Sequence, residues 1–424
     1  MHQEESKPMQ IINYKNIPDK FYESIDFESI SSVNEIINDV KLRGDEAVRE
    51  YAKKFGDGDL EQFELTEKEI KNAIASTPKE IVEAIEQSIE NVHSFAKVQL
   101  GAIKNLQTEQ NGITLGHTIF PIERTGAYVP GGNYPLPSSA IMSCVPAKTA
   151  GVKEIIVCSP KIKPATITAA KMAGADRIFR VGGVQAIAAM AYGTETIPQV
   201  SKITGPGNKY VTAAKKAVYG VCDIDFLAGP SEVMIIADES ANIKFIAADL
   251  LAQAEHDPDA RAFLITDSEK LAQEVDKQVK EFLQTLKTAN IASQSIEKSF
   301  IIVVDNIEQS IDIANKKAPE HLEVCINQED LILPHLKNYG SLFIGNYSAE
   351  VLGDYCSGTN HVLPTNSISK YTGGLSVFDF IKIQTYQKVS QKAAKEILCP
   401  VASKMAEAEG LYAHKLSADV RMEL

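Results

Sequence analysis

Four short polar stretches, far apart in the chain, carry the side chains best suited to chemistry. In the first, Gln253 and His256 stand three residues apart. Residues at this spacing are neighbours on one face of a helix, so an amide oxygen and an imidazole there can form half of a metal site. A histidine at the carboxyl end of a helix is also favoured by the helix dipole without any metal. The pair alone leaves both interpretations open.

The second stretch holds two adjacent groups that can exchange protons. Glu320 and His321 follow Pro319, between an expected helix and an expected strand at Glu323–Ile326. Their unperturbed pKa values of about 4 and about 6.5 suit an acid/base pair. We expect them at a loop edge, at the carboxyl end of a parallel sheet, where such sheets commonly place their sites. A solvated turn is the alternative.

The third and fourth stretches add carboxylates and imidazoles. Asp354 and His361 lie in a small polar segment expected to be a loop, and Glu409 and His414 lie near a polar helix expected at Gln391–Glu409. A solvated helical face is the alternative for the last pair. Oxygen and nitrogen ligands without thiolate are typical of a zinc or manganese site that keeps positions open for a substrate. The side chains that offer such ligands are Gln253, His256, Asp354 and His414.

Three glycine turns follow expected strands: Gly131-Gly132, Gly182-Gly183 and Gly205-Pro206-Gly207. Each would present backbone N–H groups at the start of a helix, which suits a phosphate group. None matches G-x-G-x-x-G, and no P-loop is present. Tight strand-to-helix turns without a ligand are the alternative.

Composition narrows the classes of function. The 424 residues include 43 basic and 56 acidic side chains, a net charge of −13, which argues against a nucleic-acid or anionic-membrane partner. No apolar run approaches a membrane span, and no signal peptide is recognised. The six scattered cysteines favour reduced thiols. We expect a cytoplasmic enzyme.

Short strands alternate with helices from about residue 113 onwards, which indicates βαβ units and parallel sheets. Ser/Thr-x-x-Glu capping boxes predict three amphipathic helices before them, starting at Ser32, Thr66 and Thr77. We expect an α/β protein with two incomplete Rossmann-like parallel-sheet domains, one inserted in the other. The expected parts are an irregular N-terminal arm (1–30), a first α/β domain with the helical N-terminal part (31–124 and 232–369), the inserted α/β domain on the dinucleotide side (125–231), and a C-terminal dimerisation tail with a strand pair (370–424).

Eight motifs, in order along the chain from about residue 30 to the end, together resemble the histidinol dehydrogenase family. Any one of them alone would be a weak signal. They are YVPGGNYPLPSS (128–139), VGGVQAIAAMAYGT (181–194), ITGPGNKYVTAAK (203–215), AGPSEV (228–233), DLLAQAEHDPDA (249–260), APEHLE (318–323), GDYCSGTNHVLPT (353–365) and EGLYAHK (409–415).

The resemblance implies a zinc-dependent oxidoreductase of histidine biosynthesis, which oxidises L-histidinol to L-histidine through histidinaldehyde with two NAD⁺. It also implies a domain-swapped homodimer in which Glu409 and His414 reach the partner's site. By position, the implied zinc ligands are Gln253, His256, Asp354 and His414. The implied substrate contacts are Ser231, Gln253, His256, His321, Asp354, His361, Glu409 and His414, and the implied NAD contacts are Tyr128, Gln185 and Asn208.

If the resemblance holds, we expect His321 to be the base of both oxidations and Glu320 to activate the water that adds to the aldehyde. The metal is expected to orient the substrate. Cys356 stands where the family more often has alanine, and we interpret it as a small packing residue. A zinc hydrolase and a non-catalytic nucleotide-binding module are the alternatives from other classes.

Overall fold

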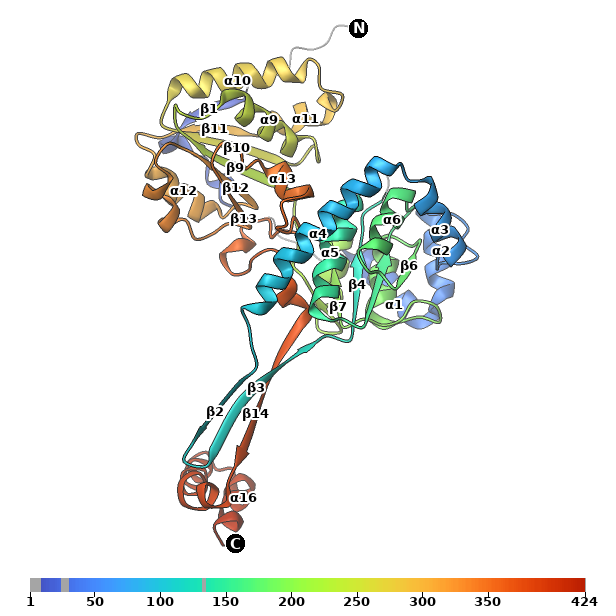
Figure 1. Ribbon diagram of the computed structural model, residues 1–424, viewed down its shortest axis with the longest axis vertical. Coiled ribbons are helices and arrows are strands. Elements are labelled where there is room, and N and C mark those ends of the chain that lie inside the picture. Colours follow the sequence, from blue (N-terminus) through green and yellow to red (C-terminus); the bar gives the residue numbers. More distant parts are fainter. Residues whose placement is uncertain (1–8, 24–29, 132–134, 424) are drawn as a thin grey trace.

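The computed structural model describes residues 9–23, 30–131 and 135–423. The chain forms two α/β units and a long arm that leads away from them to the C-terminus (Figure 1). No helix among these residues is both long and apolar enough to cross a membrane.

The first unit is built on a six-stranded sheet in which every neighbouring pair of strands is parallel. The strand order is β1-β11-β10-β9-β12-β13. One face packs on three helices, α9 (Ile243–Ala254), α10 (Glu269–Leu283) and α11 (Ala289–Ile296), and the other on α12 (Gln309–Lys317). The strands are β1 (Gln10–Asn13), β9 (Glu232–Ala237), β10 (Arg261–Thr266), β11 (Phe300–Val303), β12 (His321–Cys325) and β13 (Ser341–Ile344).

The second unit is a five-stranded parallel sheet of order β6-β5-β4-β7-β8. Taken along the chain, both this sheet and β9–β13 have the order 3-2-1-4-5, which dinucleotide-binding sheets share. The strands are β4 (Arg124–Tyr128), β5 (Glu154–Cys158), β6 (Arg177–Phe179), β7 (Lys202–Thr204) and β8 (Asp223–Ile224). The helices are α5 (Pro137–Ala150), α6 (Pro164–Met172), α7 (Gly183–Tyr192) and α8 (Lys209–Val218).

The N-terminal helices do not belong to the unit in which we expected them, the one formed with residues 232–369. Helices α1 (Ser31–Arg43), α2 (Asp45–Lys54), α3 (Glu67–Ser76) and α4 (Lys79–Gly101) share their hydrophobic cores with the five-stranded sheet, not with the six-stranded sheet. The arm expected at 1–30 is partly regular, because β1 pairs with β11 at the edge of the six-stranded sheet. The apolar stripes predicted the helices, but which sheet they cover depends on contacts distant in sequence.

Of the three predicted capping boxes, one is present in the structure and two are not. The predicted box at Thr66 is confirmed: its hydroxyl accepts from Glu69 N, and Glu69 accepts from Thr66 N at 2.8 Å. The box at Ser32 is wrong, because α1 already begins at Ser31. The box at Thr77 is also wrong: this hydroxyl donates to Ala73 O at 2.9 Å in the preceding helix, and α4 begins after Pro78.

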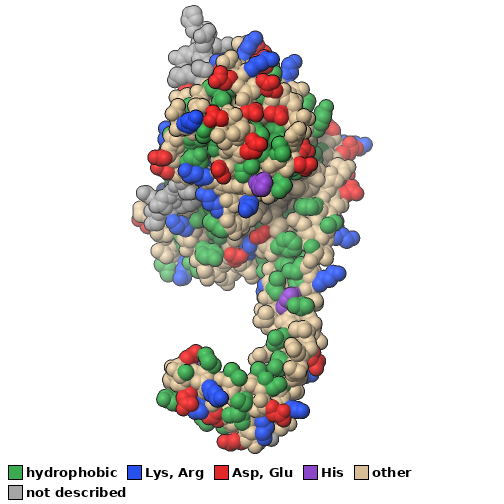
Figure 2. All heavy atoms as spheres, turned by 90° about the vertical axis from the view of Figure 1, so that its left-hand side faces the viewer, with side chains coloured by type: hydrophobic (Ala, Val, Ile, Leu, Met, Phe, Trp, Pro, Cys, Tyr) green, Lys and Arg blue, Asp and Glu red, His purple; other side chains and the backbone are tan. Residues whose placement is uncertain are grey.

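The long arm that leads to the C-terminus is a three-stranded antiparallel sheet of order β14-β3-β2, and it ends in a pair of helices. Its C-terminal strand β14 (Ile381–Val389) pairs with β3 (Ile113–Pro121), so the tail supplies one strand rather than the expected strand pair. Figure 2 shows apolar side chains along this narrow extension. The other elements are β2 (Leu106–Gln110), α14 (Gln391–Ala393), a π-helical turn (Ala394–Leu398), α15 (Cys399–Ala408) and α16 (Tyr412–Glu423).

Candidate active site

A cluster of buried polar side chains lies where β9 and β12 begin. Glu232 and His321 are the first residues of these neighbouring parallel strands. Helix α9 returns towards this edge and brings Gln253 with it. The cluster is therefore at the amino end of the sheet, and the expectation of the carboxyl end is wrong. Because the crossover helices run antiparallel to the strands, their carboxyl ends arrive at this edge, and those ends favour a cation.

His321 is the centre of the cluster and is 3% exposed. Its Nδ1 lies 3.2 Å from the carbonyl oxygen of Glu232. Its Nε2 is buried, has no hydrogen-bond partner among residues 9–23, 30–131 and 135–423, and lies 3.8 Å from Asp354 Oδ1. Burial lowers the pKa of His321 to about 3, so the imidazole is neutral at neutral pH. One ring nitrogen is thus anchored to the backbone, and the other is available for a proton.

Glu320 lies beside His321 and is 5% exposed. Its Oε2 accepts from the backbone N–H of Glu232 at 3.0 Å, and the carboxyl group is also hydrogen-bonded to the side chain of Ser231. Burial raises the pKa of Glu320 well above its usual value, with the nearby carboxylates of Glu232 and Asp354 adding to the rise. A carboxyl group in this environment takes up a proton more readily than an exposed one does. Glu232 itself is neutralised by Lys317 Nζ at 2.5 Å.

Gln253 lies in the last turn of α9. The helix ends at Ala254, so His256 lies just beyond it and not within it as predicted, but the two side chains meet. The amide of Gln253 is fully buried, and one of its end atoms lies 3.4 Å from His256 Nδ1. The imidazole of His256 is exposed and lies close enough to Asp354 to lower the pKa of that carboxyl group. Burial is the larger effect and raises the pKa of Asp354 to about 6. Three of the four predicted metal ligands therefore gather at one place.

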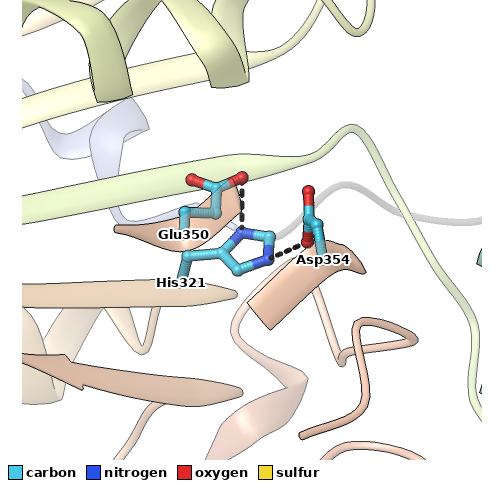
Figure 3. Close-up of side chains that lie close together, drawn as sticks. All are labelled: His321, Glu350 and Asp354. Carbon is cyan, nitrogen blue, oxygen red and sulfur yellow. Dashed lines mark ion pairs between the residues drawn. The ribbon is translucent and has the colours of Figure 1, made fainter. Parts of the chain in front are cut away.

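Asp354 lies on helix α13 (Glu350–Tyr355) and not in the loop expected for this stretch. Figure 3 shows it opposite the imidazole of His321, with Glu350 on the other side of the ring. Ligand atoms of His321, Glu350 and Asp354 lie within 4.8 Å of one another. His361 joins this group through Nδ1, 2.7 Å from the backbone oxygen of Asp354.

Glu350 is a further member of this cluster and lies outside the four stretches that the sequence indicated. It is 1% exposed, and burial together with the carboxylates of Asp354, Glu323 and Glu320 raises its pKa well above the usual value. Its Oε1 lies 3.5 Å from His321 Nδ1. The spacing of four residues to Asp354 was a helical signal that could have found it.

The site adjoins the contact between the two units. The Ser88 hydroxyl on α4 donates to Tyr355 O at 2.5 Å, and Asn91 Nδ2 donates to Cys356 O at 2.7 Å. Asn360 Nδ2 donates to Met142 O on α5, also at 2.7 Å. The segment from α13 to His361 is thereby tied to the five-stranded unit. Cys356 ends α13 and is half-buried.

The predicted dinucleotide residues lie together at the carboxyl edge of the five-stranded sheet. Tyr128 ends β4, and its hydroxyl accepts from Gly183 N at 3.1 Å. Gln185, in α7, is 1% exposed, and both of its amide atoms lack a partner within the described ranges. Asn208 caps α8 by accepting from Tyr210 N and Val211 N. Two further buried hydroxyls have no partner in the part of the chain that the structure describes. They belong to Ser159, which follows β5, and to Thr204, which ends β7.

The glycine turns have a steric reason of their own. A Cβ on Gly205 would lie 2.0 Å from Tyr128 O, and one on Gly131 would lie 2.0 Å from Pro160 O. The N–H of Gly182 is already bonded to Asp57 Oδ2 at 3.2 Å. Gly132 is outside the described residues. Close approach of backbone segments thus accounts for these glycines without a phosphate.

Glu409 and His414 do not reach this cluster within one chain. Both are exposed, and they lie at the far end of the arm, beside α15 and within α16. In Figure 1 these helices are separated from both α/β units by the length of the β14-β3-β2 sheet. If they contribute to a site, that site must belong to another copy of the chain.

A buried imidazole among carboxyl groups, placed where two α/β units meet, is the candidate site of an α/β enzyme. Residues 22–422 match the family model described as histidinol dehydrogenase. The chain belongs to the histidinol dehydrogenase family.

Individual relatives agree over nearly the whole length. Histidinol dehydrogenase of Methanocaldococcus jannaschii is 48% identical over 392 residues, which are 91% of each chain. That of Streptococcus mutans is 46% identical and covers 94% of this chain and 93% of its own. The crystal structure of histidinol dehydrogenase from Elizabethkingia anophelis superposes with a TM-score of 0.92 at 39% identity, covering 100% and 99% of the two chains.

Proposed function

We propose that this protein oxidises L-histidinol to L-histidine through L-histidinaldehyde, the last steps of histidine biosynthesis, with two NAD⁺ and one zinc ion per site. The observation that carries the proposal is the His321 imidazole, neutral and buried, whose Nε2 has no hydrogen-bond partner among the described residues and lies 3.8 Å from Asp354 Oδ1. Family membership supplies the substrate, and the geometry supplies a base where alcohol oxidation needs one.

The residues present fit a zinc ion. Gln253 offers an amide oxygen, His256 an exposed imidazole and Asp354 a carboxylate, a set of oxygen and nitrogen donors typical of zinc. His414 of a second copy would complete it. When bound there, zinc would orient the amino alcohol through its nitrogens. His321, although near Asp354 and Glu350, is assigned to proton transfer, because its Nδ1 is already anchored to the backbone.

The carboxyl edge of the five-stranded sheet fits NAD⁺. Buried polar groups are normally hydrogen-bonded, yet Gln185, Thr204 and Ser159 have no partner within the described part of the chain. A ribose or an amide of a dinucleotide would satisfy them. Tyr128 and Asn208 flank this position. When bound, the nicotinamide accepts the hydride in both oxidations.

The roles of the chain's own residues follow. His321 Nε2 takes the hydroxyl proton while hydride leaves the carbinol carbon. The aldehyde must then add water, since hydride leaves only from a tetrahedral carbon, and Glu320 takes the proton of that water. His321 acts again as base in the second oxidation. Ser231 and His361 line the substrate position, and Glu409 of a second copy would hold its far side.

We also propose a homodimer in which the arms are exchanged, and a cytoplasmic location. The arm and its terminal helices expose large apolar side chains that a second copy would cover: Leu106, Leu115, Phe120, Ile383, Val401, Met405, Leu411, Tyr412 and Leu416. Six free cysteines, five of them buried, fit a reducing compartment.

The test is the absorbance of reduced nicotinamide after L-histidinol and NAD⁺ are added to zinc-loaded protein. Two NADH per histidinol consumed, with histidine as product, is the expected result. No NADH, together with zinc-dependent cleavage of an amide or ester, would instead favour the hydrolase. NAD⁺ binding without turnover would favour the binding module.

A further inference from the structure

Gln253 is held by acceptors on one side of its amide. The side chain is fully buried. One of its two end atoms lies 3.1 Å from Glu350 Oε1, 3.3 Å from the carbonyl oxygen of Glu232 and 3.1 Å from His321 Nδ1. The carboxylate and carbonyl oxygens are hydrogen-bond acceptors, so the NH₂ group is the atom that faces them. The amide oxygen then lies on the opposite side, 3.4 Å from His256 Nδ1.

We propose that Glu350 is a positioning residue that orients the Gln253 amide so that its oxygen, and not its nitrogen, faces the zinc site. This inference rests on the proposed zinc site. An amide binds a cation through oxygen, because its nitrogen lone pair is delocalised and its N–H groups are donors. A half-turn of the Gln253 amide would therefore remove one ligand without moving any backbone atom.

Glu350 is itself fixed in place by local structure. It is the first residue of α13, and its backbone N–H donates to Glu323 Oε1 at 2.8 Å. Its Oε2 has no partner among the described residues, so a proton on the carboxyl group can reside there. Oε1 consequently accepts from Gln253 whether Glu350 is ionised or neutral.

The same arrangement is compatible with His321 as base. The carbonyl oxygen of Glu232 has two lone pairs and can accept from Gln253 and from His321 Nδ1, which lies 3.2 Å away. Gln253 then uses its second hydrogen for Glu350. The 3.1 Å approach of its NH₂ group to His321 Nδ1 is then a contact between two donors that share the Glu232 carbonyl oxygen, and not a hydrogen bond. In this network His321 Nε2 keeps its lone pair for the substrate.

The experiment measures zinc affinity by chelator competition in Glu350→Met and Glu350→Gln, with Glu323→Gln as the control from the same buried cluster. Glu350→Met has no acceptor, and we expect its zinc Kd to rise about 10- to 100-fold, the usual effect of losing a partner that orients a ligand. Glu350→Gln keeps an acceptor oxygen and should stay within about threefold of wild type, as should Glu323→Gln.

The visible spectrum of Co²⁺-loaded protein gives a second measurement, because it reports the ligand set directly. It should change in Glu350→Met and be restored in Glu350→Gln. Unchanged zinc affinity and an unchanged cobalt spectrum in Glu350→Met would overturn the inference. If Glu350→Met does not fold, as thermal unfolding of the metal-free protein will show, a large loss of zinc by Glu350→Gln would overturn it instead.

The same measurements distinguish an error in the proposed zinc site from an error in the role given to Glu350. If wild-type protein binds no zinc, or binds it equally well after Gln253→Ala, the proposed zinc site is wrong, irrespective of Glu350. If wild type binds zinc through Gln253 and the Glu350→Met variant matches it, only the orienting role is wrong.

Discussion

His321 Nδ1 lies 3.2 Å from the backbone oxygen of Glu232, the residue that begins the neighbouring strand. A backbone carbonyl can only accept, so this contact places the imidazole proton on Nδ1 and leaves the lone pair on Nε2. Because burial lowers the pKa of His321 to about 3, the ring remains neutral until it takes a proton from the substrate. A main-chain atom thus selects the tautomer that a base requires.

His321→Asn should slow both oxidations about 10²- to 10⁴-fold, the usual contribution of a positioned base. Asparagine cannot take up the proton, although it retains much of the shape. NAD⁺ affinity, measured by calorimetry, should not change, because the dinucleotide position lies on the other unit. The matched control is His335→Asn, at an exposed histidine of the same unit. Turnover that survives in His321→Asn would contradict the assignment.

Glu320→Gln should impair aldehyde oxidation much more than alcohol oxidation. Only the second half-reaction needs an activated water, and glutamine keeps the acceptor for Glu232 N while losing the ability to take a proton. Each half-reaction can be followed separately by supplying histidinol or histidinaldehyde with NAD⁺. Glu323→Gln, another buried carboxyl on the adjoining strand, is the control. Equal losses in the two half-reactions would count against water activation.

Mixed dimers can show whether a site is shared between copies. His321→Asn and His414→Asn should each be nearly inactive alone. Subunits unfolded and refolded together at equal amounts should recover about a quarter of wild-type activity, because half of the dimers are mixed and each holds one intact site. Separately refolded variants, combined afterwards without exchange, are the control. Absence of recovery in dimers shown to be mixed would argue against the exchanged arm.

Glu69→Gln should destabilise the protein more at neutral pH than in acid. The Arg180 guanidinium, and next the Thr66 N–H, lower the pKa of Glu69 to about 2. A lowered pKa contributes stability above the ordinary value, and that stability is lost as pH falls from 4.5 to about 2. Since the carboxylate is partly exposed, we expect Glu69→Gln to lower the free energy of unfolding by about 1 kcal/mol at pH 7. Urea unfolding at pH 7 and pH 3 measures it; a pH-independent difference would contradict the linkage.

Gly205→Ala should weaken the five-stranded unit and its dinucleotide edge. Gly205 has φ +109°, and an added Cβ would lie 2.0 Å from Tyr128 O. We expect a loss of at least about 2 kcal/mol in unfolding free energy together with weaker NAD⁺ binding. Gly220→Ala is the control, because φ is +99° but the space is open, so backbone strain alone costs about 1 kcal/mol there. Similar losses in the two variants would rule out the close approach as the cause.

The sequence alone predicted features that depend on neighbours along the chain. The Thr66–Glu69 capping box and the Gln253–His256 pair each span three residues, so helix geometry determines them before any folding partner is known. Alternation of strands and helices likewise predicted parallel α/β sheets, since only crossover connections join parallel strands.

Tertiary structure decided the rest. It placed the site at the amino edge of the six-stranded sheet, joined α1–α4 to the other sheet, and brought Glu350 against His321 and Gln253. Each of these depends on contacts between segments tens to hundreds of residues apart, and no local spacing encodes such contacts. They are chosen by which apolar faces are buried together when the whole chain packs.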